Sequence, residues 1–314
     1  MRVAALDIGT NTILLLVADV SADGTIATIH NDYLIPRLGR GIDESRVILP
    51  ETFDLAEQSV VSLLTIANAY SPNHLLACGT SFLRDATNAG SFVAHMRTRT
   101  GLDIRVLDGE EEARLTYLGA VSTSGIDHPD HHHAVLDIGG GSTELTYGLG
   151  RNVHRRWSVE AGCVRLTERI LGDAPPARDR INAAILEIRN HLSDLDLLPH
   201  GTTLFGVAGT VTTLAALDLG LFPYDAELTT GHVLHHSSIR TILDDLSSKS
   251  LHELQSIPQI LPGRADILVG GILILSQVMD AIGAKEIVAS DRGLRYGMVF
   301  DFVQTRMRPG QRLS

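Results

Sequence analysis

Apolar runs that end in glycine-rich turns recur along the chain and predict its strands. Residues 3–20 have the pattern strand, tight turn, strand, and residues 135–148 repeat it. The tetrapeptide Leu-Asp-Ile-Gly stands at the end of the first strand in both, at 6–9 and at 136–139. Two matched hairpins in two halves of one chain predict two similar lobes that face each other across a cleft.

The second of these turns, residues 139–142, consists of three glycines and a serine. Glycine permits positive φ and lets another molecule approach the backbone closely. Successive bare N–H groups in such a turn form a concavity that suits an anion such as phosphate. Residues 205–210 are a weaker relative, an apolar strand that ends in small residues. Either hairpin alone could be an ordinary turn, whereas the matched pair favours a ligand-binding role.

The remaining periodicity predicts an α/β fold in which strands alternate with helices. Further strands are expected at 25–30, 75–78, 104–107, 151–159 and 286–289, and helices at 51–70, 110–121, 164–171, 177–198, 211–217, 237–246, 262–282 and 293–303. The polar segment 122–133 marks the predicted boundary between an N-terminal lobe, 1–124, and a C-terminal lobe, 125–314. The last helix, at about 296–314, is expected to pack back onto the N-terminal lobe.

The predicted boundary segment is rich in histidine and acid, which raises the question of a metal site. It contains His128, His131, His132 and His133 with Asp127 and Asp130. Adjacent histidines cannot all point inward, so this cluster is more typical of a solvated loop. The two cysteines, Cys78 and Cys163, also lack metal-ligand or redox-motif spacing, which favours a reducing cytoplasm.

Composition and charge narrow the class of partner. No apolar run approaches the roughly 20 residues of a membrane span, and no signal peptide is evident. The net charge of −11 argues against nucleic acid. Lys249 and Lys285 are the only lysines and neither lies in a P-loop motif, so any phosphate would need backbone groups, hydroxyls and arginine. A GC-rich genome alone would also produce many of the arginines.

Three consecutive acids open the helix predicted at 110–121. Acids in a first turn complement the helix dipole, and Glu110 or Glu111 can pair with Arg114. Glu112 has Leu115 and Thr116 at i+3 and i+4, so no local cation balances it. A carboxylate of this kind that faces a phosphate could act as a general base towards water.

Seven segments together resemble the exopolyphosphatase and guanosine pentaphosphate phosphohydrolase family, within the actin, Hsp70 and sugar-kinase fold group. They are LDIGTNT (6–12), GTSFLRDATN (79–88), GEEEARLTYLG (109–119), DIGGGSTEL (137–145), GVAGT (206–210), LPGRADILVGG (261–271) and SDRGLRYG (290–297). The resemblance covers nearly the whole chain in order. It implies two ribonuclease H-like lobes and the short form of the family, without the extra C-terminal helical domains of longer relatives.

The resemblance also implies roles for particular residues. Glu112 matches the catalytic glutamate that activates water. Acids that match those associated with the divalent metal, Mg²⁺ with Mn²⁺ as an alternative, are Asp7, Asp137 and Glu144. Positions that match the binding of phosphate are Thr10, Asn11, Arg84, Gly139, Gly140, Gly141, Ser142, Gly209, Thr210 and Arg264. A structural cap or a salt bridge is the alternative for Arg264. Tyr296 departs from the family, which usually has an acid there.

The implied activity is that of an exopolyphosphatase, which hydrolyses the terminal phosphoanhydride of inorganic polyphosphate and releases orthophosphate. The terminal phosphoryl group would lie between the two hairpin turns. A guanosine pentaphosphate 5′-phosphohydrolase would need the same site, and nothing in the sequence separates the two. A non-hydrolytic regulator that binds polyphosphate or guanosine tetraphosphate is a third hypothesis, which the intact acids disfavour. The family also implies a homodimer, and neither nucleic acid nor a membrane is an expected partner.

Overall fold

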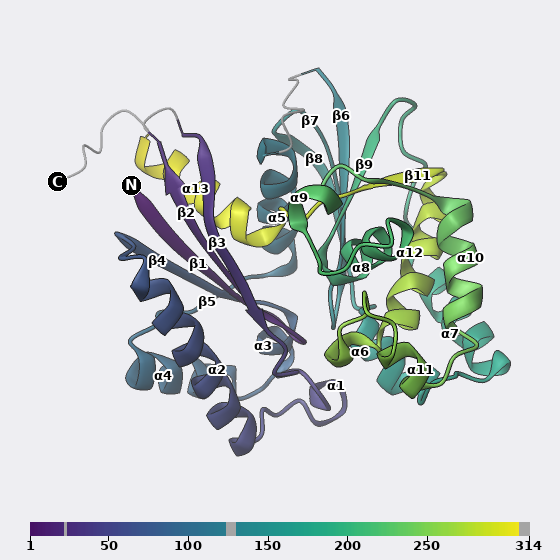
Figure 1. The fold of residues 1–314 in the computed structure, drawn as a ribbon, viewed down its shortest axis with the longest axis horizontal. Coiled ribbons are helices and arrows are strands. Elements are labelled where there is room, and N and C mark those ends of the chain that lie inside the picture. Colours follow the sequence, from purple (N-terminus) through teal and green to yellow (C-terminus); the bar gives the residue numbers. More distant parts are fainter. Residues whose placement is uncertain (22–23, 124–129, 308–314) are drawn as a thin grey trace. The chain divides into compact units, whose positions relative to one another are not determined.

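The computed structural model describes residues 1–21, 24–123 and 130–307, and the chain divides into two compact units (Figure 1). Unit 1 comprises Met1–Ile126 and Gly293–Ser314, and unit 2 comprises Asp127–Arg292. The chain therefore leaves unit 1 and returns to it at its end. In the described part of the chain, no helix has both the length and the apolar character to cross a membrane.

Unit 1 contains a five-stranded sheet in the order β3-β2-β1-β4-β5. Its strands are β1 (Arg2–Ile8), β2 (Ile13–Val20), β3 (Ile26–Leu34), β4 (His74–Gly79) and β5 (Arg105–Val106). The first three form an antiparallel meander, and β4 and β5 run parallel to β1. The helices of unit 1 are α1 (Ile42–Ser45), α2 (Pro50–Ala69), α3 (Ser81–Asp85), α4 (Ala89–Thr100), α5 (Gly109–Thr123) and α13 (Leu294–Met307).

Unit 2 contains a six-stranded sheet in the order β10-β11-β9-β6-β7-β8. Its strands are β6 (His132–Ile138), β7 (Thr143–Leu149), β8 (Asn152–Val159), β9 (Thr203–Val207), β10 (Val233–His235) and β11 (Glu286–Ala289). Its helices are α6 (Cys163–Leu166), which continues as a π-helical turn (Thr167–Leu171), α7 (Arg178–His191), α8 (Ala208–Asp218), α9 (Ala226–Thr229), α10 (His236–Leu246), α11 (Leu251–Gln255) and α12 (Leu268–Ile282), preceded by a 3₁₀ turn (Pro262–Arg264).

The two units share one plan, which confirms the predicted α/β class with two similar lobes. In each, an antiparallel meander (β1-β2-β3 or β6-β7-β8) is extended by a strand parallel to its first member (β4 or β9). The turns also match, because Gly9 N–H donates to the Thr12 carbonyl and Gly139 N–H to the Ser142 carbonyl, both at 3.0 Å. The duplicated sequence motif therefore corresponds to a duplicated structure.

Helices cover both faces of the unit 1 sheet, which explains why β1 and β2 are apolar at almost every position. On one face, α2 and α4 pack against Leu6 and Leu15. On the other, α5 and α13 pack against Val3 and Leu16 (Figure 1). In unit 2 the largest apolar cluster gathers around α12, in which nearly every side chain is buried. A strand buried on both faces has no need of polar alternation.

Several predicted boundaries were wrong. The helix expected at 177–198 ends at His191, because Ser193, Asp194 and Asp196 follow. These residues compete for backbone hydrogen bonds, and acids oppose the dipole at a helix C-terminus. The helix expected from 262 begins as a 3₁₀ turn, and α12 starts at Leu268. The short helices α1, α9 and α11 and the longer α4 were not predicted.

The boundary segment predicted at 122–133 is shorter in the structure. Ser122 belongs to α5, whereas His132 and His133 belong to β6. His133 is buried and its ring packs against Phe205, so it is a core residue. His132 Nδ1 shares a hydrogen bond of 2.6 Å with the hydroxyl of Tyr147. The interpretation of Asp127 and His128 as a solvated loop concerns residues outside the described part of the chain.

Two glycines allow α5 and α13 to cross at backbone contact within unit 1. A Cβ on Gly297 would overlap the carbonyl oxygen of Leu115, and one on Gly119 would overlap that of Gly293. No side chain separates the helices at this point, and neither backbone can withdraw without moving its helix. Because α5 carries Glu112, the crossing fixes the helix on which the candidate base lies.

We expect Gly297→Ala to lower the free energy of unfolding by about 1–3 kcal/mol, because the added methyl group overpacks a backbone contact. Denaturant unfolding of the variant and the wild type measures this difference. Gly90→Ala is the matched control, since a Cβ on this exposed helical glycine of α4 meets nothing within 4 Å. The control should be neutral or slightly stabilising. Equal stability of Gly297→Ala and wild type would contradict the proposed tight crossing.

Candidate active site

The turn of unit 1 has its carbonyl groups held by a loop that follows β3. Gly39 N–H donates to the Thr10 carbonyl at 2.8 Å, and Arg37 N–H donates to the Asn11 carbonyl at 3.0 Å. In a planar trans peptide, the carbonyl and the next N–H point in opposite directions. The tied carbonyls of Thr10 and Asn11 therefore orient the N–H groups of Asn11 and Thr12, and neither N–H meets an acceptor among the described residues. The turn therefore presents amide hydrogens on the side away from the loop.

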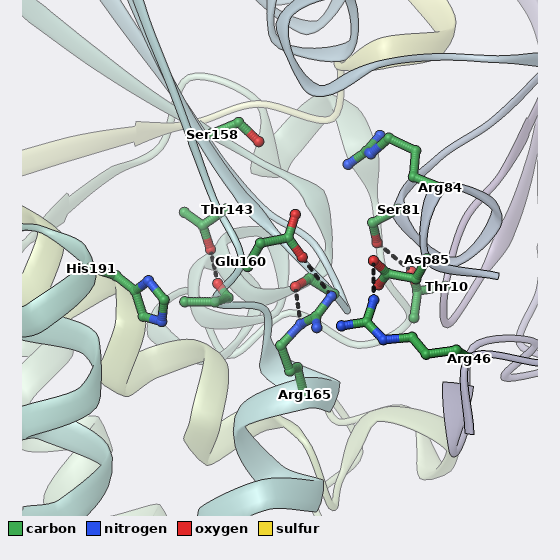
Figure 2. A network of polar contacts seen from close by, with 12 residues as sticks. Thr10, Arg46, Ser81, Arg84, Asp85, Thr143, Ser158, Glu160, Arg165 and His191 are labelled. Carbon is green, nitrogen blue, oxygen red and sulfur yellow. Dashed lines mark hydrogen bonds and ion pairs between the residues drawn. The ribbon is translucent and has the colours of Figure 1, made fainter. Parts of the chain in front are cut away.

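Side-chain contacts also hold the turn of unit 1. The buried hydroxyls of Thr10 and Ser81 share a hydrogen bond of 2.9 Å (Figure 2). Asn11 is also buried, and within residues 1–21, 24–123 and 130–307 no donor reaches its Oδ1. A Cβ on Gly39 would overlap the methyl group of Thr10, so only glycine lets the loop approach this closely. Gly39 and Ser81 were not predicted as site residues, since each acts only through a contact distant in sequence.

Arg84 and Glu112 form an ion pair in the interior of unit 1. Arg84 Nη1 donates to Glu112 Oε2 and, at 3.0 Å, to the carbonyl of Leu107. The two side chains are 18% and 10% exposed, so water screens the pair weakly. Glu112 is held at this point because the side chain of Asp108 caps α5, accepting the Glu111 N–H at 2.7 Å.

As predicted, no cation from its own helix balances Glu112, because Glu111 takes the nearby cations, Arg114 at 3.8 Å and Arg105 at 3.1 Å. The cation for Glu112 instead comes from α3, 28 residues earlier in the chain. Arg84 and Glu112, two separately predicted site residues, are thus brought into contact.

Asp7 belongs to the same region of unit 1. It is the register partner of Cys78 in the neighbouring strand β4. Burial raises the pKa of the Cys78 thiol, and the negative charges of Asp7 and Glu112 raise this pKa further. Both carboxylates therefore lie near one buried thiol, at the carboxyl ends of β1 and β4. Unit 1 gathers Asp7, Arg84 and Glu112 there, beside the turn that contains Thr10.

In unit 2 the glycine loop, residues Gly139–Ser142, has its carbonyls held by the start of α6. The contacts run from Cys163 N–H to the Gly139 carbonyl (2.9 Å), from Val164 N–H to the Gly140 carbonyl (2.9 Å) and from Arg165 Nε to the Gly141 carbonyl (2.8 Å). The N–H groups of Gly140 and Gly141 donate to no acceptor in the part of the chain that the structure describes. As in unit 1, the carbonyl side is occupied and the amide side is presented outward.

Two acids lie next to the glycine loop, directly opposite each other across β6 and β7. Asp137 and Glu144 are register partners, so their side chains leave the same face of the sheet. Glu144 is 2% exposed and accepts a hydrogen bond of 3.0 Å from the Ser158 hydroxyl. Like charges in this relation destabilise a sheet unless a cation lies near them.

This pair of carboxylates fits a magnesium ion better than a metal held by protein alone. In the described ranges, no group of three or more His, Cys, Asp or Glu side chains is placed to hold a metal. Mg²⁺ commonly takes one or two carboxylates and completes its shell with waters and substrate phosphate oxygens. Asp137 and Glu144 satisfy that requirement, and their donor chemistry is all oxygen.

The third small-residue segment is a strand-to-helix junction at the end of β9, not a hairpin turn. Ala208 has φ of 65°, a strained conformation for a residue with a side chain, and α8 begins there. The guanidinium of Arg264 packs so closely on Gly209 that no Cβ would fit, and Thr210 packs in the same way on Gly271. Asp137 is the register partner of Val207, which places this junction at the same sheet edge as the acids.

Arg264 also lies close to the glycine loop. Burial raises the pKa of Cys163 to about 11, and the charge of Arg264 opposes that rise. Since Cys163 N–H holds the Gly139 carbonyl, Arg264 and the loop share a neighbour. Unit 2 thus gathers every residue predicted for it: the glycine loop, Asp137, Glu144, Gly209, Thr210 and Arg264.

Tyr296, which departs from the expected acid, is explained by packing. Its ring is buried in unit 1, and its hydroxyl shares a hydrogen bond of 2.9 Å with Thr28 and accepts one of 3.3 Å from Asn31. The neighbouring Arg295 is also buried, donating to the Leu15 carbonyl at 2.9 Å. This segment anchors α13 to the sheet of unit 1.

The duplicated anion-binding turns, the acid–arginine pair and the two opposed carboxylates define a class of α/β phosphate-handling proteins. Comparison with known proteins agrees with this class: residues 16–306 match the model of the Ppx/GppA phosphatase family. The chain belongs to that family and is accordingly a hydrolase.

Three relatives illustrate this similarity, and each is matched over almost its whole length. Exopolyphosphatase 2 of Mycobacterium tuberculosis is 30% identical, over 95% of this chain and 97% of the relative. The crystal structure of the Aquifex aeolicus Ppx/GppA family member matches with a TM-score of 0.83 at 29% identity, covering 98% of this chain and 99% of that one. An exopolyphosphatase from Cytophaga hutchinsonii matches with a TM-score of 0.87 at 25% identity, covering 97% and 98%.

We expect Gly39→Ala to displace the loop that holds the unit 1 turn, raising KM for a phosphorylated substrate and lowering stability by about 1–3 kcal/mol. The overlap is chiefly with the Thr10 methyl group. Thr10→Ser removes that methyl group and keeps the hydroxyl that pairs with Ser81. The double variant should therefore recover most of both losses, in steady-state kinetics and thermal unfolding. A double variant no better than Gly39→Ala would show that the close approach is not what the turn requires.

Proposed function

We propose that this protein is an exopolyphosphatase, which hydrolyses the terminal phosphoanhydride bond of inorganic polyphosphate and releases orthophosphate. One observation carries the proposal: the buried carboxylate of Glu112 contacts the guanidinium of Arg84. A base for water and a cation for a phosphoryl oxygen are thereby adjacent. The names of relatives such as exopolyphosphatase 2 of M. tuberculosis support polyphosphate as the substrate.

The ion pair gives Glu112 a substrate-dependent role. A terminal phosphoryl group carries more negative charge than a carboxylate and competes for the donors of Arg84. As Arg84 turns to the phosphoryl group, Glu112 loses part of its stabilisation and becomes a better proton acceptor. It then takes a proton from water while the water oxygen attacks phosphorus in line, and the bridging oxygen leaves with the shortened chain.

The turn of each unit is suited, by itself, to contact phosphate oxygens. In unit 1 the N–H of Asn11 faces away from the tied Thr10 carbonyl, and in unit 2 the N–H groups of Gly140 and Gly141 face away from the tied carbonyls of Gly139 and Gly140. Fixed N–H dipoles need no reorganisation to meet phosphate oxygens, so they bind the phosphoryl group in the ground state and in the transition state alike. Arg264, packed on Gly209, adds a full positive charge in unit 2.

Asp137 and Glu144 would hold a Mg²⁺ ion in unit 2, with Mn²⁺ as an alternative. When bound, the ion supplies Lewis-acid stabilisation of the negative charge on the phosphoryl oxygens. The protein itself orients the two carboxylates. The Ser158 hydroxyl fixes Oε1 of Glu144, and the strand register places Asp137 opposite Glu144.

We expect Glu112→Gln to reduce kcat for orthophosphate release from polyphosphate by about 100-fold or more, because the amide cannot accept the proton. Glu110→Gln, in the same helical turn, is the control and should retain activity. The assay compares polyphosphate of defined length with guanosine pentaphosphate. Release only from the nucleotide would replace the proposal with the 5′-phosphohydrolase activity. Binding of either compound without release by the wild type would indicate a regulator.

We expect Glu144→Gln to raise the Mg²⁺ concentration for half-maximal activity by at least about 10-fold, since one anionic ligand is lost. A Mg²⁺ titration of polyphosphate hydrolysis at saturating substrate measures the shift. Glu187→Gln changes a surface acid of α7 in the same unit and should leave the titration unaltered. An unshifted titration for Glu144→Gln would remove this carboxylate from the metal site.

A further inference from the structure

Arg165 is a buried cation behind the glycine loop. Its side chain is 5% exposed, and its Nε donates to the Gly141 carbonyl at 2.8 Å. On the other side, its Nη2 donates to Glu160 at 2.7 Å (Figure 2). Its own backbone N–H donates to the Gly140 carbonyl at 3.1 Å. One residue thus holds two consecutive carbonyls of the loop, one with its main chain and one with its side chain.

The loop and the start of α6 satisfy each other's backbone groups. The first N–H groups of a helix have no partner within the helix, and in the described structure no side chain caps α6. The loop carbonyls accept these N–H groups instead. Gly162, just before α6, must lack a side chain, because a Cβ there would overlap the peptide between Gly140 and Gly141. The contact is therefore main chain against main chain.

This arrangement determines where the loop amides point. Because the peptide is planar and trans, fixing the Gly141 carbonyl towards Arg165 fixes the Ser142 N–H in the opposite direction. The same argument applies to Gly140 and the N–H of Gly141. A positive charge at the carbonyl oxygen also polarises the peptide and strengthens its N–H as a donor. Arg165 therefore influences the direction and the donor strength of the loop N–H groups, although it contacts only the carbonyl groups on the opposite side of the loop.

We propose that Arg165 is a positioning residue that sets the phosphate affinity of the glycine loop through the Gly141 carbonyl. The proposal rests on the proposed function, since it concerns the loop that would bind the terminal phosphoryl group. Arg165 itself touches no substrate. A purely structural ion pair with Glu160 would explain the contact that Nη2 makes. It would not explain why the buried Nε donates to the Gly141 carbonyl.

The test compares Arg165→Met and Arg165→Lys with the wild-type protein. Methionine fills similar space but removes both donors and the charge, while lysine keeps the charge and loses the planar donor pair. We expect Arg165→Met to raise both KM for polyphosphate and Kd for tripolyphosphate by about 10-fold, the equivalent of one charged hydrogen bond. Turnover, kcat, should change by less than about 2-fold, because the loop binds ground state and transition state alike. Arg165→Lys should give values of KM and Kd between those of the wild type and those of Arg165→Met.

Arg155→Met is the matched control, since Arg155 lies on β8 of the same unit, pairs with Asp196 and covers the Trp157 ring. It should leave KM, Kd and kcat unchanged. If Arg165→Met does not fold, Glu160→Gln loosens the guanidinium from an exposed position and should raise Kd by about 2- to 4-fold. Isothermal titration calorimetry with tripolyphosphate measures Kd for each folded variant, and thermal unfolding confirms folding.

The outcomes separate this proposal from the proposed function. A wild type that hydrolyses polyphosphate, with Kd unchanged in Arg165→Met and Glu160→Gln, would overturn the role of Arg165 alone. A wild type that binds tripolyphosphate without hydrolysing polyphosphate would overturn the exopolyphosphatase proposal, and the comparison of Kd would still decide the role of Arg165. Lost kcat with unchanged Kd would also overturn it, because the effect would then not be one of affinity.

Discussion

The carbonyl groups of the two hairpin turns are tied back by main-chain N–H groups and, at Gly141, by the side chain of Arg165, and the candidate active site depends on this constraint. A free glycine-rich turn samples many conformations, and its amides would converge on an anion only after a loss of entropy. Here the loop that contains Gly39 and the start of α6 remove that freedom in the folded chain. The planar trans peptide then converts a constraint on carbonyls into an orientation of amides.

The two units satisfy this constraint by different means, and the difference follows from their side chains. The unit 1 turn contains Thr10, whose hydroxyl bonds to Ser81, so a side chain helps to fix the backbone. The glycine loop of unit 2 has no side chain until Ser142, and only groups from outside can hold it. That role falls to the N-terminus of α6 and to Arg165, which together contact three successive carbonyls. A turn with more glycines has fewer side chains of its own to fix it, so more of the hydrogen bonds that hold its backbone must come from neighbouring segments.

How much the sequence could predict depends on the range of the interaction. The two hairpins and the helix predicted at 110–121 depend on short patterns, and the structure confirms them. The contacts that define the site join distant residues: Arg84 and Glu112 are 28 positions apart, and Arg165 and Gly141 are 24 apart. No periodicity encodes such pairs. The resemblance to a family could point to Arg84 and Glu112 as separate residues, but not to their contact, and it gave no reason to consider Arg165.

The acidic net charge of the protein is compatible with a polyanionic substrate because the positive charge is placed locally and largely by the backbone. Arg84 is neutralised by Glu112, and Arg165 by Glu160, so neither adds a free cation to the surface. Near the turns there remain the guanidinium of Arg264 in unit 2 and a set of oriented amide dipoles, whose field falls off within a short distance. Dipoles favour a phosphoryl group already in contact more than they attract anions in general.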